Sequence, residues 1–181
     1  MKINVFGASG AGTTTLGKAL ADRYNSRFLD ADDYYWQKTE PPFQYKVPLA
    51  ERSKGLLRDL QSADAAVLSG SMTTWGEEWL EAFDLGVFLY IPPEVRMQRL
   101  QKREIERYGK QLQSDSTIAK TSKDFLAWAR KYDAPNFEGR SITQHKDWIK
   151  IVRFPVLKIE GDFSVAELIE KLNDKVTELK T

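Results

Sequence analysis

The stretch that decides the fold is Lys2–Leu16, which reads KINVFGASGAGTTTL. An apolar run up to Phe6 is typical of a buried strand, a loop with three glycines follows, and a helical pattern begins at Leu16. Glycines adopt backbone angles that other residues avoid and leave room for close approach. A strand, a glycine loop and a helix in this order therefore present bare backbone N–H groups and a helix N-terminus to an anion. We predict a phosphate-binding loop here.

The glycine spacing G-x-x-G-x-G differs from the dinucleotide fingerprint G-x-G-x-x-G and fits the P-loop pattern G-x-x-x-x-G-K-[ST], except that Thr13 fills the lysine position. Loss of that charge is expected to cost about 3 kcal/mol of transition-state stabilisation unless another cation replaces it. Lys18, one turn further on, is better explained as a solvated helix lysine. The predicted nucleotide-binding residues of the loop are Gly7, Ser9, Gly10, Ala11, Gly12, Thr13, Thr14 and Thr15.

The composition narrows the classes of protein. The chain has 181 residues, enough for one domain with a sizeable core, and its net charge is +1. This balance gives no reason to expect nucleic acid or an anionic membrane as a partner. The absence of cysteine excludes disulfides and thiolate chemistry, and a single histidine, His145, excludes a multi-histidine metal centre. Without a leader-like start or a bilayer-spanning apolar run, the chain is expected to be soluble and cytoplasmic.

A second strand is predicted at Arg27–Asp30, and it ends in the acidic run Asp30-Ala31-Asp32-Asp33. Ligands of open α/β sheets bind at the carboxyl ends of the strands, so these carboxylates are expected to face the same crevice as the glycine loop. We expect Asp30 to hold Mg²⁺ together with Thr14, and Asp32 to orient or deprotonate an attacking hydroxyl. The alternative is that Asp30 or Asp32 only caps the next helix.

The segment Tyr34–Tyr45 is rich in aromatic residues and contains tandem prolines, without helical or strand periodicity. It predicts an ordered, irregular segment that either walls a pocket for a planar or apolar substrate or packs under a small helical insertion. A helix is predicted for Pro48–Leu60. We therefore expect an acceptor-binding insertion at about 34–62 within a single domain of residues 1–181.

Two further strands are predicted, at Ala65–Leu68 and Leu85–Ile91. Many P-loop proteins end the strand equivalent to the first of these with an aspartate that orders the Mg²⁺ shell, whereas this chain has Ser69. The carboxylates after the second strand are then expected to order the Mg²⁺ shell. Trp75 is a candidate for the pocket wall or for the core, and Trp75–Phe83 is predicted to form a short helix.

The helix predicted after Pro92-Pro93 carries four arginines at spacings that place them along one face: Arg96, Arg99, Arg103 and Arg107. Arginine forks fit phosphate oxygens and stack on purine rings. We expect Arg99 to bind nucleotide, and Arg103 and Arg107 to stabilise a phosphoryl group in transfer. The alternative is a solvated face paired with neighbouring glutamates, and Arg96 is the least suited of the four to function.

The polar segment Tyr108–Thr121 is predicted to be a mobile loop that acts as a lid, followed by a helix at Ser122–Tyr132. Arg140, in the break after this helix, is a candidate to bring a guanidinium back to the phosphates. A helix at Ser141–Lys150 carries His145, for which a structural or substrate-orienting role is preferred to a catalytic one.

The C-terminal part predicts a last strand at Pro155–Glu160, and a capping box, Ser164–Glu167, that starts a closing helix. The predicted inner face of that helix comprises Leu168, Ile169, Leu172, Val176 and Leu179. Five short strands alternating with helices predict an α/β fold with a doubly wound parallel sheet.

These residues resemble the nucleoside monophosphate kinase and shikimate kinase group of P-loop kinases, in particular the small adenylate-kinase-related proteins of bacteria. The resemblance covers nearly the whole chain and is carried by the glycine loop, Asp30-Ala31-Asp32, the Arg99–Arg107 stripe, Arg140, and Gly161 after the last strand. It implies a three-layer α/β/α fold with strand order 2-3-1-4-5 and a helical lid. It also implies ATP and Mg²⁺ as cofactors, adenine near Gly161, and transfer of the γ-phosphoryl group to a small acceptor.

The leading hypothesis is an ATP-dependent kinase of a small cytosolic molecule, in which Arg103, Arg107 and Arg140 replace the missing lysine charge. The alternative is a nucleotide-binding sensor or regulatory module without catalysis. The glycine spacing disfavours a Rossmann-type oxidoreductase. We expect a monomer or homodimer whose partners are the nucleotide and the small acceptor.

Overall fold

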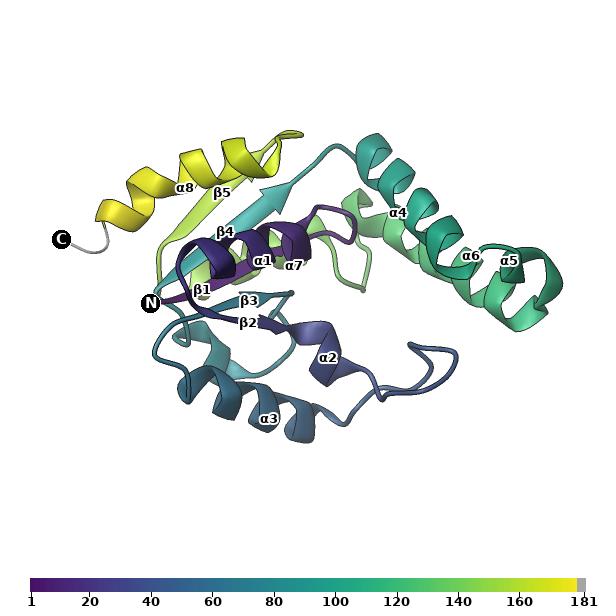
Figure 1. Cartoon of the computed structure of the whole chain (residues 1–181), viewed down its shortest axis with the longest axis horizontal. Helices are drawn as coiled ribbons and strands as arrows, with labels where there is room; N and C mark the ends of the chain where they lie inside the picture. The colour runs from purple at the N-terminus through teal and green to yellow at the C-terminus, as the bar shows by residue number, and fades with distance from the viewer. Residues whose placement is uncertain (179–181) are drawn as a thin grey trace.

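The computed structural model describes residues 1–178, and a five-stranded parallel sheet forms its centre (Figure 1). The strand order is β2-β3-β1-β4-β5, which confirms the predicted fold class. Helices cover both faces of the sheet, which is why the central strands read as nearly continuous apolar runs. The strands are β1 (Lys2–Gly7), β2 (Arg27–Asp30), β3 (Ala66–Ser69), β4 (Leu85–Tyr90) and β5 (Val156–Glu160).

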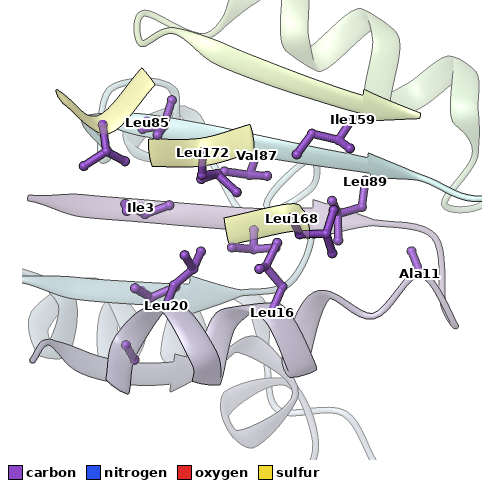
Figure 2. Close-up of a cluster of buried hydrophobic side chains, with 14 of the residues drawn as sticks. Ile3, Ala11, Leu16, Leu20, Leu85, Val87, Leu89, Ile159, Leu168 and Leu172 are labelled. Atoms are coloured by element: carbon purple, nitrogen blue, oxygen red, sulfur yellow. The ribbon is translucent and has the colours of Figure 1, made fainter. Parts of the chain in front are cut away.

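Helices α1 (Thr13–Arg23) and α8 (Val165–Glu178) cover one face of the sheet, as Figure 2 shows. Apolar residues spaced by a helical turn meet strand side chains that point to this face. The buried cluster includes Leu16 and Leu20 of α1, Leu168 and Leu172 of α8, and Ile3, Val5, Val87 and Leu89 of the strands. This packing holds the start of α1 at the end of the short loop that follows the central strand.

Helix α8 begins with the predicted capping box. The Ser164 backbone N–H donates to Glu167 Oε2 at 2.8 Å, and the Glu167 N–H donates to Ser164 Oγ at 3.3 Å. Along the predicted inner face, Leu168, Leu172 and Val176 are buried, whereas Leu179 lies outside the described residues.

The opposite face of the sheet is covered by α3 (Leu49–Gln61) and α7 (Ile142–Ile151). Successive strand residues point to opposite faces, so Phe6 and Phe88 lie here while their neighbours pack against α1 and α8. A second buried cluster, rich in aromatic rings, includes Phe6, Leu56, Leu60, Leu68, Trp79, Phe88, Trp148 and Phe154.

Three helices form a hairpin that extends away from the sheet (Figure 1): α4 (Pro93–Tyr108), α5 (Gln111–Ser114) and α6 (Ser116–Arg130). We call it the α4–α6 hairpin. Met97 and Leu100 of α4 and Ala129 of α6 form a small buried cluster at its base, with Phe125, Leu126 and Trp128 packed against it. The hairpin therefore has an apolar contact surface of its own.

The prediction of a loop at Tyr108–Thr121 is wrong, because most of this segment is helical. Asp115 caps α6: its carboxylate accepts from the backbone N–H groups of Thr117 at 2.8 Å and Ile118 at 3.1 Å. Ile118 is also buried. Helix α6 thus starts six residues before the predicted Ser122, since a local cap and one apolar anchor outweigh the polar composition.

The remaining elements are short. Helix α2 (Ala31–Tyr35) leads into an irregular segment that Trp36 and Lys46 close with an isolated antiparallel bridge. A 3₁₀ turn, η1 (Glu77–Leu80), replaces the longer helix predicted after Trp75, and a second, η2 (Lys131–Asp133), follows α6. Among the residues that the structure describes, no helix is both long and apolar enough to cross a membrane.

Candidate nucleotide-binding site

The glycine loop connects β1 to α1, with Gly10 and Gly12 at φ angles of 83° and 89°. A Cβ atom on Gly10 would lie 2.9 Å from the Arg96 carbonyl oxygen, so both the angle and the close approach require glycine. Gly12 is the N-cap of α1 and provides no side-chain hydrogen bond to the helix, whose first turn has no acidic residue. The loop therefore leaves helix N-terminal N–H groups for an anionic ligand.

A cavity of about 460 Å³ opens over this loop, at the carboxyl ends of the strands. The loop after the central strand forms its floor, and side chains following β2 and β3 meet side chains from α4 and the start of α8 around it. Of the predicted site residues, the cavity is lined by Gly7, Ser9, Gly10, Ala11, Gly12, Thr13, Thr14, Thr15, Asp30, Asp32, Arg99, Arg103 and Arg140.

Two hydroxyls and a carboxylate meet beside the loop. Thr14 Oγ1 donates to Asp30 Oδ2 at 3.2 Å and lies 3.3 Å from Ser69 Oγ. Burial raises the pKa of Asp30 above its ordinary value, and the nearby Asp32 carboxylate adds to this effect, whereas hydrogen bonds from the Asp32 backbone and Thr14 oppose it. Asp30 also caps α2 by accepting from the Asp32 N–H at 3.1 Å, as the capping alternative predicts.

This donor set fits Mg²⁺. The ion takes hard oxygen ligands and keeps several waters, so one carboxylate and one or two hydroxyls beside a phosphate suffice. No group of three or more histidine, cysteine or carboxylate residues gathers as a metal site in the part of the chain that is described.

The four arginines, which the spacing places along one side of α4, lie in different environments. Arg96 is fully buried: its Nε donates to the Ile91 carbonyl at 3.2 Å, its guanidinium pairs with Asp133, and it lies over the Tyr132 ring. The first turn of α4 sits where the hairpin joins the sheet, so this position faces protein rather than solvent. Arg96 is therefore structural.

Arg99 and Arg103 both line the cavity. Arg99 pairs with Asp162, in the turn after β5, and its Nη1 would lie 3.9 Å from a Cβ atom on Gly12. Arg103 lies over the Phe125 ring at 5.7 Å and has no ion pair with any described residue. Partial burial of its guanidinium lowers the Arg103 pKa, and the charge of Arg107 adds to this effect. The negative charge of an anion in the cavity would oppose this lowering of the Arg103 pKa.

Arg107 and Gly161 are not among the described residues that line the cavity. Arg107 pairs with Glu104 at 3.4 Å and lies 4.8 Å above the ring of Phe43, in the aromatic segment. Gly161 has a φ of 127° in the turn after β5, and a Cβ atom there would press against Phe163. Phe163 and Ser164, which follow Gly161 in the chain, do line the cavity.

The sequence analysis missed several lining residues. Phe163 and Leu168 were not singled out as site residues, although they follow the last strand at the same edge of the sheet as the glycine loop. Two residues from predicted pocket-wall candidates do line the cavity: Tyr35, from the aromatic segment, and Trp75, which is only 3% exposed and so serves both the wall and the core. The signal that could have found Phe163 and Leu168 is their position after the last strand.

His145 is completely buried, and one of its two ring nitrogens contacts a residue that lines the cavity. Its Nδ1 lies 2.7 Å from the Tyr132 hydroxyl, and its Nε2 lies 2.9 Å from Ser71 Oγ, which lines the cavity. Burial, with a smaller contribution from the charge of Arg140, lowers the pKa of His145 to about 3. The imidazole is therefore neutral, and Ser71 is a lining residue that no sequence pattern indicated.

A glycine loop between the central strand and its helix, in a sheet of order β2-β3-β1-β4-β5, defines a P-loop, kinase-like nucleotide-binding fold. Residues 3–120 match the family model described as AAA domain, and the chain belongs to this family of P-loop proteins. It is related to small-molecule kinases, as the individual matches indicate.

A Bacillus subtilis (strain 168) protein, YqaC, described as uncharacterized, is 42% identical over 172 residues, which span 95% of each chain. A cytidylate kinase from Methanocorpusculum labreanum is 27% identical over 120 residues, covering 58% of this chain and 63%, less than two thirds, of that enzyme. The structure of Acinetobacter baumannii shikimate kinase in complex with shikimate has a TM-score of 0.56 and 19% identity, and covers 98% of this chain and 93% of that one. This last likeness shows the fold alone.

Proposed function

We propose that the protein is an ATP-dependent kinase that transfers the γ-phosphoryl group to a hydroxyl of a small acceptor. The observation that carries the proposal is that three features converge on one cavity. They are the glycine loop with the uncapped N-terminus of α1, the cluster of Thr14, Asp30 and Ser69, and the guanidinium groups of Arg103 and Arg140. The kinase names of the relative and of the fold neighbour support a small-molecule acceptor.

The two ends of the cavity suit different ligands. Phe163 and Leu168 offer apolar surface at the end next to β5, where Arg99 also lies, which suits a nucleotide base. Asp32, with Tyr35 and other residues that follow β2 and β3, lines the opposite end, which suits an acceptor that bears hydroxyl groups. The glycine loop between the ends is the place for the phosphates.

The chain's own groups then have separate tasks. Backbone N–H groups from Ser9 to Thr14 hold the phosphates, and Thr14 and Asp30 hold Mg²⁺, which when bound supplies positive charge to the phosphate oxygens. Asp32 accepts the proton that the acceptor hydroxyl loses. The new bond joins the acceptor oxygen to the γ-phosphorus, and the bond to the bridging oxygen breaks with its electron pair leaving on ADP.

The missing lysine charge is replaced by arginine. Arg103 and Arg140 line the cavity, and we assign them to the oxygens of the transferring group. Arg107 is assigned the same task, for which its side chain has to leave Phe43 and turn inwards.

The test is an ATP titration of the purified protein with and without Mg²⁺, followed by thermal stability and by transfer of labelled γ-phosphate to sugar acids, nucleosides and nucleoside monophosphates. Asp30→Asn should lose the Mg²⁺ enhancement of ATP binding, because asparagine keeps the helix cap and removes the charge. Asp33→Asn, at an exposed neighbouring position, is the matched control. Equal Mg²⁺ enhancement in both variants would remove Asp30 from the metal site.

A second candidate function is a nucleotide sensor without catalysis. It is favoured by Thr13 in the lysine position and by the exposure of Lys18, which lies 5.7 Å above the Phe28 ring rather than against the loop. Thr13→Lys discriminates between the two functions. A large gain in hydrolysis or transfer identifies a disabled site, and loss of an existing wild-type activity identifies threonine as part of a working one.

A further inference from the structure

A chain of hydrogen-bonded side chains runs from the core to the cavity surface. The Tyr132 hydroxyl and His145 Nδ1 are 2.7 Å apart, and His145 Nε2 and Ser71 Oγ are 2.9 Å apart. Ser71 Oγ lies 3.1 Å from Thr73 Oγ1, which donates to Gln144 Oε1 at 3.0 Å. Of these five residues, Ser71 lines the cavity over the glycine loop.

The number of hydrogens available fixes which group donates in each of these hydrogen bonds. Thr73 has one hydroxyl hydrogen and gives it to Gln144, so the Ser71 hydroxyl donates to Thr73. Ser71 then accepts from His145 Nε2–H, and the bare Nδ1 accepts from the Tyr132 hydroxyl. Burial among Phe6 and Phe88 keeps the imidazole neutral, in agreement with this single-proton form.

Ser71, which lines the cavity, therefore has a lone pair left on its Oγ and no hydrogen left to donate. If every hydrogen bond in this series ran in the opposite direction, Ser71 would still have no hydrogen to donate to a ligand. Its hydroxyl hydrogen would then be donated to His145 instead of Thr73. Ser71 is 5% exposed, so its oxygen meets little bulk water. A ligand group that reaches it has to be a donor, since an acceptor oxygen would face another lone pair.

The position of Ser71 places this oxygen at the acceptor end of the cavity. It is two residues beyond Ser69, which pairs in register with Asp30. Gly70, with a φ of 134°, turns the chain here, and a Cβ atom on it would overlap that of Ala31. The loops after β2 and β3 are thus in direct contact, and Asp32 and Ser71 line the same end.

We propose that Ser71 is a specificity-determining residue whose oxygen accepts a hydrogen bond from the phosphoryl acceptor, so that the acceptor carries a second hydroxyl or an amino group besides the hydroxyl that is phosphorylated. The inference rests on the proposed kinase function and narrows its substrate class to polyhydroxylated or aminohydroxylated molecules. His145 is a positioning residue that acts through Ser71. A neutral hydrogen bond of this kind is expected to change kcat/KM about tenfold.

The test measures ATP-dependent phosphorylation of acceptors that differ in the number of donor groups. Glycerate and gluconate carry two or more hydroxyls, and lactate and glycolate carry one. The wild-type protein should prefer the first pair. Ser71→Ala should lower kcat/KM for the preferred acceptor about tenfold and leave KM for ATP unchanged. The ratio of kcat/KM between the two pairs of acceptors should then fall close to one. Ser62→Ala, at the end of α3 on the surface, is the matched control.

A second pair of variants separates positioning from packing. His145→Phe keeps an aromatic ring between Phe6 and Phe88 but cannot hold the Ser71 hydroxyl, so it should lower the preference as Ser71→Ala does. His145→Gln retains a side-chain N–H near the position of Nε2 and should restore part of the preference.

The outcomes separate the two proposals. If the wild-type protein phosphorylates these acceptors and Ser71→Ala has the same acceptor preference, the role of Ser71 is overturned and the kinase function stands. If the wild-type protein phosphorylates acceptors with one hydroxyl and acceptors with two or more equally well, the role of Ser71 is likewise overturned and the kinase function stands. ATP binding without phosphorylation of any of these acceptors, or of the nucleosides and nucleotides named above, would overturn both together.

Discussion

The buried guanidinium of Arg96 is paired with the carboxylate of Asp133, and this contact joins the first turn of α4 to the turn that follows α6. The two ends of the α4–α6 hairpin are thereby held together at the edge of the sheet. The Arg96 backbone also touches the glycine loop, since its carbonyl oxygen blocks a Cβ atom at Gly10. The ion pair thus links the hairpin base to the phosphate site.

Asp133→Asn should destabilise the protein by about 3 kcal/mol, because it leaves a buried guanidinium without a counter-charge. Urea unfolding measures the change. Glu106→Gln breaks the exposed ion pair between Lys102 and Glu106 and serves as the control, with an expected loss of less than about 0.5 kcal/mol. Similar losses in the two variants would contradict the structural role of the buried pair.

Arg103→Ala should lower the turnover of phosphoryl transfer about 100-fold and weaken ATP binding much less. The reason is that a charge aimed at the transferring group acts mainly in the transition state. Steady-state kinetics and an ATP titration measure the two effects. Arg58→Ala, on the exposed side of α3, should change neither. Equal losses of turnover and binding in Arg103→Ala would argue against a transition-state role.

The stability of the protein should depend on pH through His145. Its pKa is lowered from the ordinary 6.5 to about 3 in the folded chain, so between these values the unfolded chain binds one more proton. Stability therefore rises with pH through this window and falls on acidification, by about 1.4 kcal/mol for each pH unit at most. Urea unfolding of the wild type and of His145→Phe from pH 4 to 7 isolates the contribution, and parallel curves would contradict it.

The sequence was sufficient for the sheet because apolar runs with clear ends need no tertiary information. The second strand, Arg27–Asp30, was predicted with its observed bounds, and the glycine loop and capping box were read from spacing alone. Within the α4–α6 hairpin, the helical state of Tyr108–Thr121 was missed because it depends on a cap at Asp115 and on contacts between two helices, which polar residues do not reveal.

The site was predictable where a motif is local and not where it is assembled from distant segments. Ser71 and His145 are 74 residues apart, and the direction of the serine hydroxyl follows from a chain that no spacing encodes. Arg96 was grouped with its helix neighbours because periodicity reports which side of a helix a residue lies on. Whether that side faces solvent or the sheet depends on how the helix docks.

The helical state of residues 111–130 has a consequence for the cost of closing over a ligand. A mobile loop would lose about 1–2 kcal/mol of conformational entropy for each residue ordered by the nucleotide, and that loss would be subtracted from the affinity. A hairpin that is already folded and anchored at its base would avoid most of this loss if it closed by rotating as a unit. Because α4 has 16 residues and spans about 24 Å, a rotation of about 10° at its base carries its tip about 4 Å.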